Sequence, residues 1–290
     1  MENLFEKGCL VQLSIGVWRA AKKIDQRKLA QMTESHEWLS ATKKLIDPEA
    51  LKPIAKIGNS ARSYLKGVSL PFPLNGMVFV PKDMINMIDE KLQEFKDEFH
   101  MALDSFIRDY DYLRTIANGR LGELFNELDY PVDIRQKFSF VWRFVILDVP
   151  NGNAGILSPE VYEREKEKFV QTMEEARELA IKSLREEFAS MVTRITERFT
   201  TGPDGKPKVF KNSTVNSFYE YFETFKERNI FKDDDLAEVV NQAQSILSGT
   251  APDMLRSDEY LRASIGADMA TIESKMAEIL TMPRRKVVMD

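Results

Sequence analysis

Apolar residues recur along two long stretches of the chain in alternating steps of three and four positions, the spacing of one face of an α-helix. The first stretch covers residues 82–127 and the second covers residues 159–199. The apolar seam of the second is Phe169, Met173, Ala176, Ala180, Leu184, Phe188, Met191, Ile195 and Phe199. The pattern predicts two long helices that pack antiparallel with the helices after residue 212. A break or bend is expected in the first near Asn118-Gly119.

Three shorter segments have the pattern of β-strands. Residues 9–17 alternate between apolar and polar or small side chains, which is typical of a half-buried strand. Residues 77–80 form a short apolar run that Pro81 closes. Residues 138–149 are β-branched and aromatic on both faces, and this predicts a mostly buried strand. We therefore expect a two- or three-stranded antiparallel sheet.

The remaining apolar periodicity predicts further helices and sets the domain organisation. These helices are expected from Pro48 to about Gly67 and over residues 213–228, 233–248 and 257–281, with a short extended segment over 206–210. The fold class is α+β and predominantly α, built from long antiparallel helices with a small antiparallel sheet. We expect a main α+β domain over residues 1–212, on which a C-terminal helical segment, residues 213–290, packs.

Few residues in the chain are suited to catalysis or metal binding. Cys9 is the single cysteine, and His36 and His100 are the only histidines, which is too few for a zinc site of the usual kind. Asp233, Asp234 and Asp235 are expected to cap a helix rather than to hold a cation. Glycine motifs that bind phosphate are absent. We predict no catalytic residue, cofactor or metal, and a non-enzymatic protein in a reducing, cytoplasmic compartment that does not span a membrane.

The net charge of −5 conceals a basic beginning, because residues 1–81 contain 12 Lys and Arg against 7 Asp and Glu. The basic side chains there form pairs, with Trp18 and Trp38 among them: Lys22, Lys23, Arg27, Lys28, Lys43 and Lys44. Basic side chains bind phosphates, and exposed aromatic rings stack on unpaired bases. This set is therefore a candidate nucleic-acid face, with an ordinary solvated surface as the alternative.

Two other segments are candidates for protein contacts. Part of the seam of the second long helix could bind another helix or a second copy of the chain: Phe169, Met173, Leu184, Phe188, Met191 and Ile195. The segment from Arg284 to Met289 is basic and then apolar, and it could be a frayed tail or a segment that docks on a partner.

Several local strings together resemble an uncharacterised family of proteins from tailed phages and integrative conjugative elements. They are VQLSIGVW at 11–18, SLPFPLNGMVFVP at 69–81, LDYP at 128–131 and FSFVWRFVILDVP at 138–150, with the spacing of Phe99, Phe106 and Tyr110. Genes of that family commonly lie beside those for a MoxR-type AAA+ ATPase and a von Willebrand factor A-domain protein. The resemblance implies a bacterial host and brings no functional residues with it.

Three functions are compatible with the sequence. The first is a non-enzymatic adaptor or scaffold of a phage or mobile genetic element, working with the MoxR-type ATPase and the von Willebrand factor A-domain protein. In this case the chain itself hydrolyses no nucleotide. The second is a DNA-associated accessory protein of recombination or replication. The third is a helical membrane-active protein, although Arg143 and Asp148 in the apolar segment 138–149 oppose membrane insertion.

Overall fold

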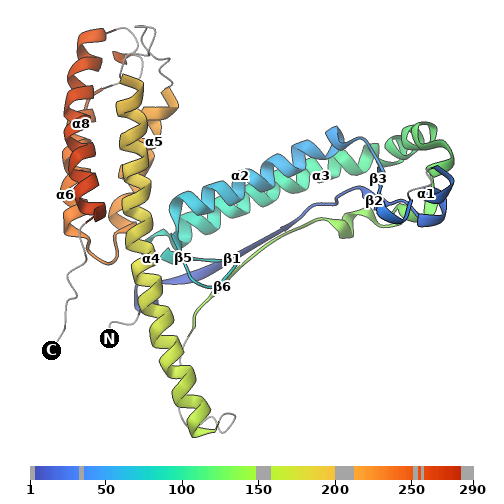
Figure 1. Cartoon of the computed structure of the whole chain (residues 1–290), viewed down its shortest axis with the longest axis horizontal. Helices are drawn as coiled ribbons and strands as arrows, with labels where there is room; N and C mark the ends of the chain where they lie inside the picture. The colour runs from blue at the N-terminus through green and yellow to red at the C-terminus, as the bar shows by residue number, and fades with distance from the viewer. Residues whose placement is uncertain are drawn as a thin grey trace. The chain divides into compact units, whose positions relative to one another are not determined.

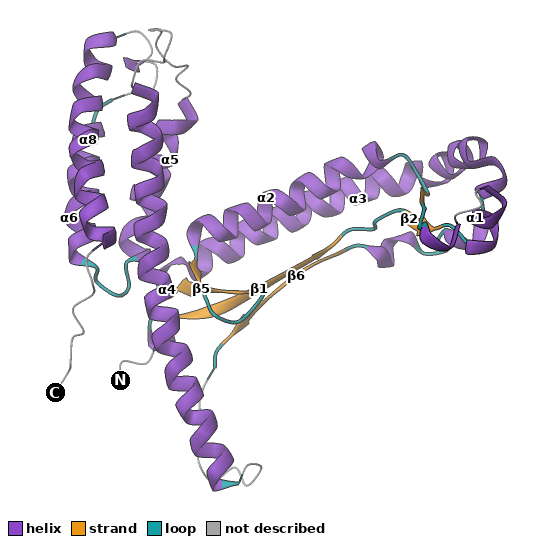
Figure 2. Ribbon diagram, viewed as in Figure 1, coloured by secondary structure: helices purple, strands orange, loops and turns teal. Residues whose placement is uncertain are grey.

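The computed structural model describes residues 4–32, 36–147, 158–199, 212–250, 254–255 and 258–281, which form two compact units (Figure 1). Unit 1 contains residues 1–10, 68–84 and 146–290, and unit 2 contains residues 11–67 and 85–145. Helices dominate and the sheets are small, so the predicted α+β, predominantly α class is confirmed (Figure 2). The chain crosses between the units several times, whereas the sequence suggested one boundary near residue 212.

Unit 1 contains a bundle of four helices: α4 (Pro159–Phe199), α5 (Asn212–Arg228), α6 (Asp234–Leu247) and α8 (Glu259–Thr281). Each lies where its apolar spacing predicted it. Helices α4 and α8 are antiparallel, because Arg185 donates to the carbonyl oxygen of Ile279 while Thr193 donates to the carboxylate of Glu273. The extended segment expected over 206–210 lies outside the described residues.

A β-hairpin in unit 1 packs on this bundle. Strands β4 (Leu70–Pro71) and β5 (Met77–Pro81) pair antiparallel, and β5 is followed in the sheet by β1 (Gly8–Gly16), in the order β4-β5-β1-β6. Gly8 is required by close approach, since a Cβ atom there would lie 2.1 Å from the carbonyl oxygen of Val80. Lys7, which lies just before β1, donates from Nζ to the carbonyl oxygen of Ile230 at 2.8 Å. This hydrogen bond joins the start of β1 to the segment after α5.

Unit 2 is built on two helices, α2 (Lys52–Val68) and α3 (Ile85–Leu121), the first entered through a 3-10 turn η3 (Pro48–Leu51). Their seams meet in an aromatic core, where the rings of Tyr64 and Phe95 lie 5.9 Å apart. Helix α3 continues through Asn118-Gly119 without the expected break. It ends at Leu121 because Gly122 adopts a φ of +52°, which a glycine accepts without strain.

The later part of β1 and strand β6 (Ser139–Val145) cover one side of this core. The prediction that this segment is mostly buried is wrong over β6, where Phe140 is the one buried residue and Val141 and Phe144 are substantially exposed. Trp142 is half-buried, with its Nε1 donating to Asp89 of α3 at 2.8 Å. Strand β6 therefore has only one packed face, and the other face, with Ser139, Val141 and Arg143, is exposed.

The far end of unit 2 contains elements that the apolar pattern did not predict. Strands β2 (Ala21–Lys23) and β3 (Thr42–Lys44) form a separate antiparallel pair, and helix α1 (Gln26–Met32) lies between them in sequence. The 3-10 turns η2 (His36–Trp38), η5 (Gly122–Leu124) and η6 (Glu127–Asp129) complete this region. We call these elements, with the residues up to Val132, the hairpin end of unit 2 (Figure 2).

Candidate interaction surfaces

The structure brings the six predicted basic residues together at the hairpin end. Lys22 and Lys43 are directly opposite each other in the β2-β3 pair, Ala21 opposes Lys44, and Lys23 opposes Thr42. Because side chains alternate along a strand, Lys22 and Lys43 share one face while Lys23 and Lys44 share the other. Arg27 and Lys28 lie on α1. The six basic residues predicted from sequence therefore lie in one region, but the lysines of the β2-β3 pair are divided between its two faces.

The face with Lys22 and Lys43 is occupied by the chain itself. Lys43 Nζ lies 2.6 Å from Asp129 Oδ2, on side chains that are 9% and 10% exposed, and it also donates to the carbonyl oxygen of Leu124. Lys22 Nζ lies 3.8 Å from the other oxygen of Asp129. These contacts fasten β2 and β3 to the turns η5 and η6. Lys43 is consequently a structural residue and is not available to a phosphate.

Lys28 on α1 also binds the turn that follows α3. Its Nζ donates to the carbonyl oxygen of Glu123 at 2.6 Å, in the turn that follows α3. The end of a helix carries carbonyl groups without intrahelical partners and a partial negative charge, so an ammonium group there is favourable. Lys28 and Lys43 together satisfy two successive carbonyls beyond α3. Three of the six predicted basic residues therefore stabilise this end of unit 2: Lys22, Lys28 and Lys43.

The other three basic side chains remain exposed. Lys23, Arg27 and Lys44 make no side-chain hydrogen bond or ion pair with any residue that the structure describes. The same region also contains acidic residues. The described hairpin end has five carboxylates against its six cations: Asp25, Glu37, Glu123, Glu127 and Asp129. The local charge is nearly balanced, so this end lacks the strong positive excess of a nucleic-acid face.

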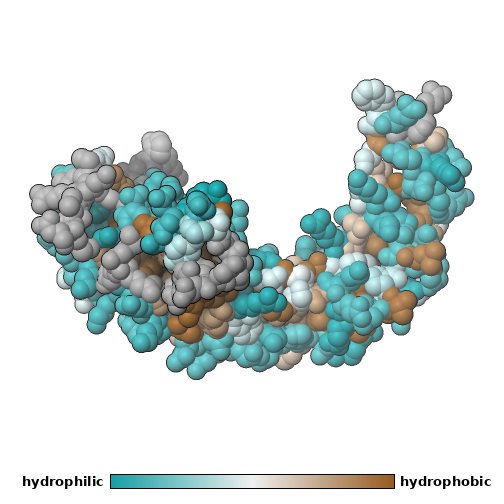
Figure 3. Space-filling view, turned by 90° about the horizontal axis from the view of Figure 1, so that it is seen from below, coloured by the Kyte–Doolittle hydropathy of each residue, from teal (hydrophilic) through white to brown (hydrophobic). Residues whose placement is uncertain are grey.

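Large apolar side chains are exposed at the same end. Trp38 on η2 is 91% exposed and Leu128 on η6 is 90% exposed, with Val132 completely exposed just beyond. Hydrophobic residues also emerge among hydrophilic ones at the right-hand end of Figure 3. Trp18, by contrast, is packed edge-on against Tyr110 at 5.9 Å. Sequence reasoning noted Trp38 but missed Leu128 and Val132, because a single apolar residue in a loop gives no periodic signal.

The predicted interaction seam on α4 is divided by burial. Leu184, Phe188, Met191 and Ile195 are buried within unit 1. The ring of Phe188 lies 5.4 Å from that of Tyr221 and 6.1 Å from that of Phe218, both on α5. This part of the seam is therefore core, and it is covered by helices of the same chain.

The earlier part of α4 is less covered. Phe169 and Met173 are half-buried, and the surrounding residues are mostly charged and exposed. Ion pairs along the helix, such as Lys168 with Glu165 at 2.7 Å, stabilise this stretch locally. Within unit 1, this beginning of α4 extends beyond the helices of the bundle (Figure 1).

Polar contacts fix the junction between α4 and α6. Asp233 caps α6 by accepting from the backbone N–H of Leu236, as expected from sequence. The same carboxylate accepts two hydrogen bonds from Arg185, at 2.6 and 2.7 Å, while Arg185 also donates to Ile279. The hydrogen bonds that Arg185 donates to Asp233 raise the pKa of Arg185 above its usual value. Asp233 and Arg185 together thus link α4, α6 and α8.

Three residues were considered for catalysis or metal binding: Cys9, His36 and His100. Cys9 is buried, and this burial raises the pKa of its thiol. His100 is exposed on α3, and the side chain of His36 lies outside the described residues. Searching the described residues finds no cluster of His, Cys, Asp or Glu that could hold a metal ion. No helix in the same residues is long and apolar enough to cross a bilayer.

Comparison with protein families places most of the chain in a family of unknown function. The model of a protein family of unknown function, DUF3150, matches residues 5–200. The chain belongs to the DUF3150 family. The match includes all of unit 2 and ends after α4, so α5, α6 and α8 lie beyond it. Neither the curated proteins nor the solved structures gave a match.

The end of the DUF3150 match has a structural implication. The buried seam of α4 lies within the matched residues, whereas the helices that cover it, α5 and α8, follow residue 200. The matched region therefore does not contain the complete core of unit 1. Residues 212–281 are needed to bury Leu184, Phe188 and Ile195.

Proposed function

We propose that this DUF3150 protein is a non-enzymatic adaptor that binds a partner protein through the hairpin end of unit 2. The exposure of Trp38, Leu128 and Val132 at one end of a folded unit is the observation that carries the proposal. Exposed tryptophan is uncommon, and aromatic residues are enriched at the centres of protein interfaces. A second folded unit on the same chain leaves another surface free for a different contact.

The charge pattern favours a protein partner over nucleic acid. Lys43 is buried against Asp129, and Lys28 is bound to a carbonyl oxygen, so the phosphate-binding capacity is lower than the sequence suggested. Leu128 and Val132 have no planar face on which a base could stack. An interface with apolar anchors and a mixed-charge rim is typical of protein contacts.

The partner that we propose follows from the resemblance described above. It is a MoxR-type AAA+ ATPase, acting with a von Willebrand factor A-domain protein in a phage or mobile genetic element of a bacterial host. The described part of this chain shows no metal cluster, and the whole sequence lacks a phosphate-binding glycine motif. In this proposal the ATPase supplies the nucleotide chemistry, and the adaptor supplies recognition.

Binding of the purified chain to the MoxR-type ATPase of the same genome tests the proposal. We expect the two to co-elute in the presence of ATP or ADP, and the chain to change the ATP turnover of its partner. Trp38→Ala combined with Leu128→Ser should weaken this binding at least about tenfold, as expected for interface anchors. Tyr260→Ala is the matched control, because Tyr260 is equally exposed on α8 of unit 1. If the chain and the ATPase do not associate in the presence of any nucleotide tested, the ATPase is removed as the partner.

A DNA-associated accessory role is the second candidate. Trp38 provides an exposed ring, and Lys23, Arg27 and Lys44 provide cations free of described partners on the same end of the unit. This arrangement would suit single-stranded DNA, where rings stack on bases and cations follow the backbone. We rank this role below the adaptor role because positive and negative side chains nearly balance at the hairpin end.

A further inference from the structure

The exposed side of α2 carries cations and no carboxylate. This helix has four Lys and Arg and no Asp or Glu among its 17 residues. Residues three and four apart are neighbours on a helix surface, so five exposed residues form one stripe: Lys52, Lys56, Asn59, Ser63 and Lys66. Lys56 and Lys66 make no hydrogen bond or ion pair with any residue that the structure describes. The stripe is therefore a basic surface on which two charges have no described partner.

Helix α3 lies beside α2 and has the opposite net charge, with eight Asp and Glu against five Lys and Arg. Its exposed side carries a stripe of carboxylates, apolar side chains and a serine: Glu98, Met101, Ser105, Asp109 and Tyr112. Met101 is 66% exposed and Tyr112 is 69% exposed. Within the described part of the chain, Glu98 and Asp109 have neither a hydrogen bond nor an ion pair. Such a surface fits a partner that offers cations and space for an apolar side chain.

The two stripes share one face of unit 2. The helices are antiparallel, because Asp47 just before α2 pairs with Arg120 near the end of α3 at 3.7 Å. Figure 2 shows strands β1 and β6 on one side of the two helices. Arg62, about a quarter turn from the α2 stripe, donates to the carbonyl oxygen of Ile15 in β1. Lys96, about half a turn from the α3 stripe, lies against β6. Both stripes therefore lie on the face that the strands leave uncovered.

The α2 stripe is hollowed along its first half. A shallow groove of about 820 Å³ follows the helix there, and its lining includes the short side chains of Ala55, Ser60 and Ser63 beside Lys56. These short side chains leave room for a longer side chain from another molecule. The groove thus supplies the space that an exposed apolar residue such as Met101 needs.

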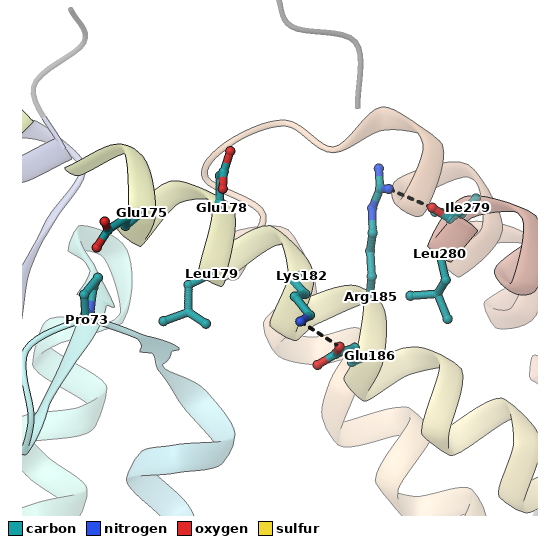
Figure 4. A pocket seen from close by; sticks show the side chains of 9 residues that line it. All are labelled: Pro73, Glu175, Glu178, Leu179, Lys182, Arg185, Glu186, Ile279 and Leu280. Carbon is teal, nitrogen blue, oxygen red and sulfur yellow. Dashed lines mark hydrogen bonds and ion pairs between the residues drawn. The ribbon is translucent and has the colours of Figure 1, made fainter. Parts of the chain in front are cut away.

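The two cations of the groove between α4 and the end of α8, in unit 1, both have partners. Lys182 pairs with Glu186 at 3.6 Å, and Arg185 donates to the carbonyl oxygen of Ile279 (Figure 4). The positive charge of that groove is therefore satisfied within unit 1. The lysines of the α2 stripe differ from it in this respect.

We propose that two copies of the chain pair through this face of unit 2, with α2 of each copy against α3 of the other. A two-fold axis parallel to the helices gives this arrangement, whereas a perpendicular axis would place α2 on α2 and bring lysines together. Lys56 and Lys66 lie about 15 Å apart along α2. Glu98 and Asp109 lie about 17 Å apart along α3, so two ion pairs fit each of the two contacts. This pairing does not depend on the partner at the hairpin end.

Met101 of the second copy lies over the groove in this arrangement. A two-fold axis parallel to the helices leaves each residue at its own level along them. The contact between Tyr64 and Phe95 sets the register of α2 and α3. It places Met101 within about 3 Å of the level of Ser60. A methionine side chain adapts well to an irregular gap. Exposed ion pairs each contribute little, so we expect a dissociation constant in the micromolar range.

Sedimentation of the full-length chain over a range of micromolar concentrations tests the pairing. We expect a monomer–dimer equilibrium for the parent. Lys56→Glu with Lys66→Glu should raise the dissociation constant at least about tenfold, because like charges then face each other. Glu98→Lys with Asp109→Lys should have the same effect. A parent that remains monomeric at every concentration would overturn the proposal.

Mixing the two charge-reversed variants tests which helices face each other. In the mixed pair, the acidic α2 of one copy meets the basic α3 of the other, and the unaltered α2 meets the unaltered α3. The mixture should therefore dimerise like the parent, although neither variant does so alone. The control is Lys23→Glu with Lys44→Glu, which changes the net charge equally at exposed positions of unit 2 and should leave pairing unchanged. A mixture that stays monomeric, or a control that loses pairing equally, would overturn the proposal.

Cross-linking identifies the facing positions directly. In a Cys9→Ala background, Ser60→Cys and Met101→Cys chains each carry one thiol, so a short bismaleimide can join only two chains. When the two kinds of chain are mixed, links between positions 60 and 101 should predominate in mass spectrometry. Links mainly between two positions 60 would show that α2 faces α2 and would overturn the arrangement. Melting followed by circular dichroism verifies that each variant is folded.

Discussion

Lys43 and Asp129 are 86 residues apart in the chain, yet their side chains form a nearly buried ion pair in unit 2. Lys43→Met should therefore leave the Asp129 carboxylate without its partner and the Leu124 carbonyl oxygen without its donor. Removing one member of a buried pair costs about 3 kcal/mol. Urea unfolding followed by circular dichroism measures this loss. The control is Lys44→Met, which should change stability by less than about 0.5 kcal/mol because Lys44 is exposed. Equal effects of the two would contradict the structural role of Lys43.

Leu184→Asp should unfold the helical bundle of unit 1. Leu184 is 3% exposed on α4, and the hydroxyl of Tyr221 donates to its carbonyl oxygen at 3.2 Å. An unpaired carboxylate there costs several kcal/mol, of the order of the stability of a whole domain. We expect loss of the cooperative melting of this unit by calorimetry. Tyr260→Asp, on the exposed side of α8, should melt as the parent does. A Leu184→Asp chain with unchanged melting would show that this seam is not core.

Stability should decrease as the pH rises above about 10. Burial raises the pKa of Tyr221 far above its usual value, whereas in the unfolded chain a tyrosine ionises near pH 10. Above that pH the unfolded state binds fewer protons than the folded state, so the free energy of unfolding falls by up to about 1.4 kcal/mol per pH unit for this group. Below pH 10 its contribution is fully present.

Tyr221→Phe isolates this contribution. The variant should lose about 1 kcal/mol at neutral pH, because the hydrogen bond to Leu184 is removed. Its stability should then depend less steeply on pH between 10 and 11 than that of the parent. Urea midpoints at pH 8, 10 and 11 provide the comparison, with the exposed Tyr260→Phe as control. Identical slopes for the parent and Tyr221→Phe would contradict the assignment.

Titration with labelled DNA separates the adaptor and DNA roles. If the hairpin end binds DNA, then Lys23→Glu with Arg27→Glu and Lys44→Glu should abolish binding, and binding of the parent should weaken steeply with salt as counterions are released. We expect the parent to bind neither single- nor double-stranded DNA measurably at physiological salt. Tight, salt-sensitive binding that these three substitutions remove would favour the second candidate over the first.

The sequence predicted the long helices well, because their seams repeat over many turns. Helices α3 and α4 were expected at 82–127 and 159–199 and occur at Ile85–Leu121 and Pro159–Phe199. The β2-β3 pair was not expected, since its strands have three residues each and no apolar alternation. The exposure of β6 could not be foreseen either. Apolar residues on both faces of a strand indicate the possibility of burial but not whether a second layer is present to cover them.

The candidate sites were predicted less completely, and for a physical reason. The sequence identified the basic residues around the hairpin, but their availability depends on Asp129, Glu123 and Leu124, which are about 80 to 95 positions away. Similarly, the helices after residue 212 were expected to pack on the long helices, but the sequence did not show which part of the α4 seam they cover. Local patterns determine which side chains share a face, and long-range contacts determine which of those faces stay open.

The interleaving of the two units has a consequence for how the chain folds as it leaves the ribosome. Unit 2 is complete once residue 145 has emerged, whereas unit 1 needs residues 1–10 and 68–84 to meet helices that are made much later. At about 5 to 20 residues per second, the stretch from 146 to 281 takes roughly 7 to 30 s to synthesise. During that interval Phe79 of the β4-β5 hairpin, which in the finished protein is buried beside Ala176 and Ala180 of α4, lacks the bundle on which it packs. The nascent chain therefore exposes an apolar strand for several seconds. We expect chaperones that bind the chain during synthesis to bind at this hairpin.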